Sequence, residues 1–196
     1  MDYSYEKNLI INNRELRYSG ILRVDELFQR INRALEERGY QKREKKTEEV
    51  VTEAGRRTYI ELRPRKVKSN YAQFGIKIKI TLDHITEVVE EVQGVKKKFQ
   101  RGDLLLVFDA WILTDYENRW SMKPLAYFLK GIINKYLYTF PLEAGFPGEL
   151  VGDTAYIYAQ VQKLLQSYNP TVVKVAKEAD IVKEMEKQVL AEDMEE

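Results

Sequence analysis

Alternating apolar and polar residues define the clearest strand in the sequence, over residues 71–83. Because successive side chains of a strand point to opposite faces, this alternation predicts one buried face and one polar face. The expected buried residues are Phe74, Ile76, Ile78, Ile80 and Leu82. After an expected turn at Arg101 and Gly102, residues 104–114 are apolar at almost every position. That run predicts a central strand covered on both faces.

Shorter strand patterns lie on either side of residues 71–83. Residues 7–11 and 15–19 flank an Asn-Asn pair, which predicts a tight hairpin because asparagine tolerates a positive φ. Residues 40–52 and 56–68 predict a second hairpin, in which Pro64 favours an edge strand or a bulge. A third hairpin is expected around Gln93 and Gly94, and His84 is expected to be a turn residue.

Helical spacing first appears over residues 24–35, where acidic residues favour the start of a helix and Gly39 favours its end. A second helix is expected over residues 121–138, with Pro124 in its first turn and a wide apolar face that would lie across the sheet.

A Gly/Pro-rich loop is expected over residues 139–152. Asp153 would then cap a third helix, whose apolar stripe ends before the helix-breaking pair Asn169-Pro170. The last helix would span residues 171–191, with valines recurring at intervals of seven. The apolar stripe of this helix suggests docking or self-association, and the alternative is a frayed tail.

These elements predict the α+β class, with a curved antiparallel β-sheet packed against a long helix and additional C-terminal helices. The expected division is a sheet domain over 1–138, a loop over 139–152 and a helical extension over 153–196. The order of elements resembles, in topology, the helix-grip domains of the START and polyketide-cyclase-like superfamily over about residues 1–138. Those domains usually have two early helices and lack the two final ones. The resemblance implies an apolar small-molecule ligand.

The composition excludes several kinds of chemistry. The chain has no cysteine and one histidine, which excludes disulfides, thiol nucleophiles and zinc sites built on cysteine. No glycine-rich phosphate loop is present, so we expect no cofactor and no metal. The N-terminus does not resemble a signal peptide and no apolar run could cross a bilayer, so we expect a cytoplasmic protein. Dense mixed charge without cysteine is typical of a thermophile protein.

Charge is balanced over the whole chain but segregated along it. The chain has 32 basic and 31 acidic residues, yet residues 42–101 hold 16 basic and 9 acidic ones, a net +7, while residues 170–196 carry a net −4. Such a basic sheet attracts phosphates, and tyrosines on it could stack on bases. The alternative is an ordinary solvated sheet face. The candidate nucleic-acid-binding residues are Lys42, Arg43, Lys45, Lys46, Arg56, Arg57, Arg63, Arg65, Lys66, Lys68, Lys77, Lys79, Lys96, Lys97, Lys98, Arg101, Tyr59 and Tyr71.

A second candidate region is a contact patch or pocket formed by Asp109, Trp111, Asp115, Arg119 and Trp120. Asp109 interrupts the most apolar strand, so if buried it needs a partner. Burial could raise its pKa enough for acid–base catalysis, and the alternative is an ion pair with a lysine. The segment from Asp115 to Trp120 is either a contact patch or the start of a helix.

The leading hypothesis is a non-enzymatic binding protein. Its basic sheet would contact RNA or a ribonucleoprotein such as the ribosome, and its terminal helices would form a homo-oligomer or dock elsewhere. The first alternative is a helix-grip-like pocket for an apolar small molecule under residues 122–137. The second is an enzyme that uses Asp109. No membrane partner is expected.

Overall fold

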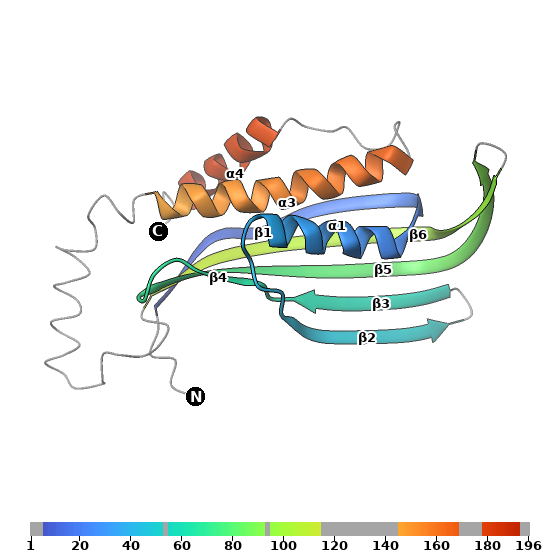
Figure 1. The fold of residues 1–196 in the computed structure, drawn as a ribbon, viewed down its shortest axis with the longest axis horizontal. Helices are drawn as coiled ribbons and strands as arrows, with labels where there is room; N and C mark the ends of the chain where they lie inside the picture. The colour runs from blue at the N-terminus through green and yellow to red at the C-terminus, as the bar shows by residue number, and fades with distance from the viewer. Residues whose placement is uncertain (1–5, 53–54, 93–94, 115–144, 169–177, 193–196) are drawn as a thin grey trace, which may run out of the picture.

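The computed structural model describes residues 6–52, 55–92, 95–114, 145–168 and 178–192. These residues form an antiparallel sheet with helices on one face (Figure 1). The strand order is β1-β6-β5-β3-β2, and β4 pairs with β5 outside this path. The predicted α+β class is therefore confirmed.

The described elements follow one another from a strand to a final helix. The strands are β1 (Glu6–Leu22), β2 (Glu44–Thr52), β3 (Gly55–Leu62), β4 (Arg65–Val67), β5 (Ala72–Val92) and β6 (Val95–Thr114). The helices are α1 (Val24–Glu37), α3 (Phe146–Tyr168) and α4 (Glu178–Glu192). The hairpin of β5 and β6 is the longest, and its far end extends past β2 and β3 (Figure 1).

The first predicted hairpin is wrong, because β1 is a single strand that pairs with β6 along most of its length. Asn13 does adopt the positive φ that asparagine tolerates, at 52°. The pairing shifts register between Leu9 and Arg14 at this point. A long partner strand in β6 lets β1 continue, so the irregularity becomes a bulge instead of a reversal of the chain.

The predicted strand over residues 71–83 is confirmed, and its five apolar residues are buried. The strand does not end there, because β5 continues through a register shift between Asp83 and Thr86. His84, with φ at 55°, is therefore a bulge residue within β5 and not a turn. Likewise β6 runs straight through Gly102, so the turn predicted there is wrong.

Helix α1 matches its prediction, and Gly39 follows it with φ at 76°. Helix α3 begins at Phe146, earlier than expected, so residues 146–152 are helical and Asp153 lies inside the helix instead of capping it. Pro147 is compatible with this start because a proline in the first turn forfeits no helical hydrogen bond. The expected apolar stripe, including Ile157 and Val161, is buried.

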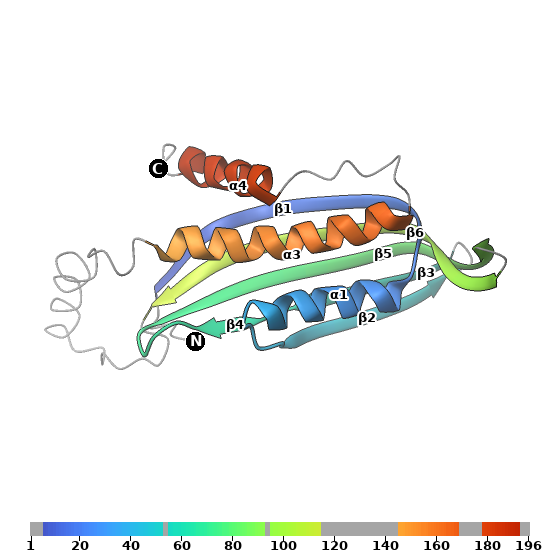
Figure 2. The same cartoon turned by 45° about the horizontal axis from the view of Figure 1, so that its top comes forward.

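Helices α1 and α3 lie side by side on one face of the sheet (Figures 1 and 2), with α3 against β1 and β6. The core between these layers contains fully buried Phe108, whose ring centroid lies 5.7 Å from that of Tyr158 in α3. Helix α4 packs on α3 and β1 and buries Ile181 and Met185 within the same chain. Its self-association stays a prediction.

Two predicted features lie outside the described residues. They are the contact segment Asp115, Arg119 and Trp120, and the helix over 121–138 under which an apolar ligand was expected. The apolar-ligand alternative therefore stays a prediction.

Candidate anion-binding face of the sheet

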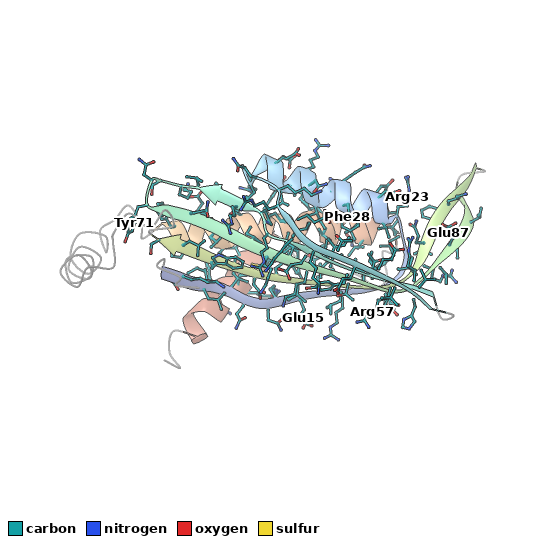
Figure 3. All side chains as sticks on the ribbon, turned by 90° about the horizontal axis from the view of Figure 1, so that it is seen from below. Glu15, Arg23, Phe28, Arg57, Tyr71 and Glu87 are labelled. Atoms are coloured by element: carbon teal, nitrogen blue, oxygen red, sulfur yellow. The ribbon has the colours of Figure 1, made fainter. Side chains whose placement is uncertain are left out.

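One face of the sheet is not covered by any helix of the described part of the chain. Figure 3 views the molecule from this side, with α1 and α3 behind the strands and the labelled Glu15 and Arg57 on the near side. Lys77, Lys79 and Thr81 of β5 belong to this face because they alternate with buried residues. We call it the open face.

Four basic side chains gather at one end of the open face, and we call them the cationic cluster. They are Lys7, Arg63, Lys77 and Lys79. The Lys77 Nζ lies 2.5 Å from Asp109 Oδ2, and the Lys79 Nζ lies 3.9 Å from the same atom.

Within this cluster, Arg63 pairs with Glu61, whose register partner on β5 is Lys79. Four cations thus face two carboxylates, Asp109 and Glu61, which leaves an excess of two positive charges.

The pKa of Lys7 reports this excess of charge. Burial lowers its pKa first, and the positive charges of Lys77 and Arg63 lower it further, while Asp109 opposes them only in part. The ammonium of Lys7 is therefore repelled by its neighbours, and a bound anion would relieve that repulsion.

Asp109 is a buried carboxylate with three polar partners. Its Oδ1 accepts a hydrogen bond from the backbone N–H of Asn13 at 2.8 Å, and its Oδ2 contacts Lys77 and Lys79. Burial alone would raise the pKa of Asp109, but the bonds from Lys77 and Asn13 outweigh it, so the pKa is lowered. Asp109 is thus an ionised partner of the cluster, not the protonated carboxyl that acid catalysis would require.

Replacing Asp109 by asparagine is expected to lower the free energy of unfolding by about 1–3 kcal/mol at neutral pH, because Lys77 loses its charged partner. A lowered folded-state pKa stabilises the protein above the ordinary pKa of 3.8, and that contribution disappears as pH falls through the folded-state value. Urea unfolding should therefore show the difference between wild type and variant shrinking as pH falls from about 6 to about 2.5.

The exposed Glu186 of α4 provides the control for this measurement. Its replacement by glutamine should change stability by less than about 0.5 kcal/mol at either pH. A difference for the Asp109 variant that is constant across the pH range would contradict the assigned ion pair.

Two of the predicted nucleic-acid-binding lysines have helix carboxylates as partners. Lys66 Nζ lies 2.8 Å from Asp153 Oδ2 and 3.0 Å from Glu149 Oε1, both in α3, and Lys68 Nζ lies 2.8 Å from Glu149. Arg38 at the end of α1 lies 3.8 Å from Asp153. This network, which the sequence analysis missed, ties the sheet to both helices.

The other predicted basic residues are spread over the sheet. Lys46, Arg56 and Arg57 pair with Glu48, Glu49 and Asp83 at 2.7, 3.5 and 3.0 Å. The exposed residues among the rest are Lys42, Arg43, Lys45, Lys98 and Arg101. Those half-buried are Arg65 and the tyrosines Tyr59 and Tyr71. The side chains of Lys96 and Lys97 lie outside the described part of the structure.

The other end of the open face carries acidic side chains as well as basic ones. A groove of about 320 Å³ lies near this end, and Asp83 and Asp103 line it as direct cross-strand neighbours. Asp103 accepts a hydrogen bond from Ser19 Oγ at 2.7 Å and lies 3.2 Å from His84 Nδ1. Arg17 also lines this groove and Arg57 pairs with Asp83, so the groove holds charges of both signs, whereas the cationic cluster has an excess of positive charge.

No protein-family model matches the chain, and neither a curated protein nor a solved structure matches it. Within the described residues, no group of three or more His, Asp or Glu side chains is placed to hold a metal ion. None of the described helices is long and apolar enough to span a bilayer.

Proposed function

We propose that this chain is a non-enzymatic RNA-binding protein whose open face contacts the phosphate backbone, either of free RNA or of RNA within a ribonucleoprotein. The observation that carries the proposal is the cationic cluster, where four basic side chains share two carboxylates. Phosphates attract such a cluster and release their counterions on binding.

Two further features support a nucleic acid over a simple anion. Lys7 lies with its Nζ 4.3 Å from the ring centroid of Trp111, and Tyr59 occupies the same face two residues before Glu61. Aromatic side chains among cations are typical of surfaces that hold unpaired nucleotides.

Salt dependence tests this proposal. The excess of two positive charges corresponds to two phosphate contacts with single-stranded RNA, which should weaken binding about 7-fold between about 50 and about 200 mM salt, because the logarithm of affinity falls by roughly 0.7 per contact for each tenfold rise in salt. Fluorescence anisotropy of a labelled oligoribonucleotide measures this directly. Affinity that is unchanged over that range, or no binding at low salt, would overturn the proposal.

A further inference from the structure

Trp111 lies close to the backbone of β5, beside the cationic cluster. Gly75 is its register partner, and a Cβ at position 75 would lie 2.5 Å from Trp111 Nε1 and 2.7 Å from Cε2. The absence of a side chain at this glycine is what lets the indole rest against the sheet.

The ammonium of Lys7 lies over the indole ring, 4.3 Å from its centroid. Trp111 is 7% exposed, whereas Lys7 is an exposed residue. Its cross-strand neighbour Leu9 is an exposed apolar side chain on the same face, at 41%. Trp111 and Leu9 are thus apolar neighbours at the edge of the cationic cluster, with a long and flexible lysine side chain over the indole.

Gln73 adds a polar group without a partner at this place. Gln73 precedes Gly75 by two residues in β5, so its side chain points to the open face, as Trp111 does. Its exposed fraction is 8%. Its Oε1 is buried and accepts no hydrogen bond from the part of the chain that the structure describes. Buried acceptors are usually satisfied, so an N–H from a molecule bound near Trp111 would supply the hydrogen bond that this oxygen lacks.

We propose that Trp111 and Gln73 form a subsite for one unpaired nucleobase. The base stacks on the indole in the place of the Lys7 ammonium, and an N–H of its edge donates to Gln73 Oε1. Lys7 then turns toward the adjoining phosphate. Every base has a flat face and an N–H donor, so the subsite selects unpaired over paired RNA without selecting one base.

This inference rests on the proposed function and deepens it, because the cationic cluster alone would bind paired and unpaired RNA alike. A duplex keeps its bases stacked and their donors occupied, so it can offer only phosphates to the open face. The chemistry of the ligand is thus a phosphodiester chain with an accessible base.

The test compares oligouridylate of about ten nucleotides with an abasic ribose-phosphate oligomer of the same length, a size within the usual range for such surfaces. A Trp120→Phe background leaves Trp111 as the only tryptophan. We expect oligouridylate to bind about 5- to 150-fold more tightly than the abasic oligomer and to quench Trp111 fluorescence, as a stacked base does. The abasic oligomer should bind without quenching.

Two variants locate the effect. Trp111→Leu should lower the affinity for oligouridylate to that for the abasic oligomer, and Gln73→Leu should lower it severalfold while satisfying the buried position with a side chain of similar size. Equal, salt-dependent binding of both oligomers without quenching would overturn the subsite and leave the proposed function standing. Failure of both oligomers to bind would overturn the two together.

Discussion

Replacing Asp153 by asparagine is expected to lower the free energy of unfolding by about 3–5 kcal/mol. Asp153 is 4% exposed, and its carboxylate neutralises Lys66 at 2.8 Å and Arg38 at 3.8 Å. A neutral amide would leave Lys66, which is also close to the rings of Tyr40 and Phe74, with Glu149 as its one charged partner among the described residues. Urea denaturation measures the loss.

A double variant tests whether this loss comes from the unbalanced charge of Lys66 and not from altered packing. Combining Asp153→Leu with Lys66→Met removes both partners and should recover much of the stability lost in Asp153→Asn, since a buried charge that has lost one of its partners costs more than an apolar pair. The exposed Asp180 of α4 serves as a control whose replacement by asparagine should cost less than about 1 kcal/mol. A loss below about 1 kcal/mol for Asp153→Asn would contradict the network.

Replacing Gly102 by valine is expected to destabilise the protein by about 2–3 kcal/mol. A Cβ at this position would lie 2.7 Å from the carbonyl oxygen of Asp83 and 2.5 Å from Ile85 Cδ1. The first of these atoms belongs to the backbone of the β5 bulge, so a rotamer change cannot remove the conflict. Thermal or urea unfolding tests this expectation.

Gly152 of α3 is the matched control, because a Cβ there would meet nothing within 4 Å. Gly152→Ala should raise stability by about 0.5–1 kcal/mol, since alanine favours a helix interior over glycine. Equal effects of the two glycine substitutions on stability would contradict the close approach of the β5 backbone to Gly102.

The sequence predicted elements well wherever their periodicity was long. The alternation in β5 and the spacing in α1 decided both their type and their buried side. The boundaries of strands were harder to predict, because residues that favour a turn locally can be kept extended by pairing with a strand far away in the sequence. Gly102 resembles a turn residue locally, yet β5 offers β6 a partner along its whole length and keeps it extended.

The candidate site was only partly visible in the sequence. Lys77 and Lys79 followed from alternation, but Lys7 joins them only because β1 pairs with β6, which in turn pairs with β5. That strand order involves contacts far apart in the chain, and no local pattern specifies it. Conversely, Lys66 and Lys68 are lysines of the basic segment just as Lys77 and Lys79 are, yet they form ion pairs with carboxylates of α3.

The central claim is that the cationic cluster contacts phosphates, and the salt dependence of charge-removing variants tests it most directly. Lys7→Gln combined with Lys79→Gln leaves the Lys77–Asp109 pair intact, and the exposed Lys163 of α3 supplies the control Lys163→Gln. The slope of log affinity against log salt should fall in magnitude from about 1.4 to near zero in the double variant and stay near 1.4 in the control. Equal slopes in all three proteins would contradict the account.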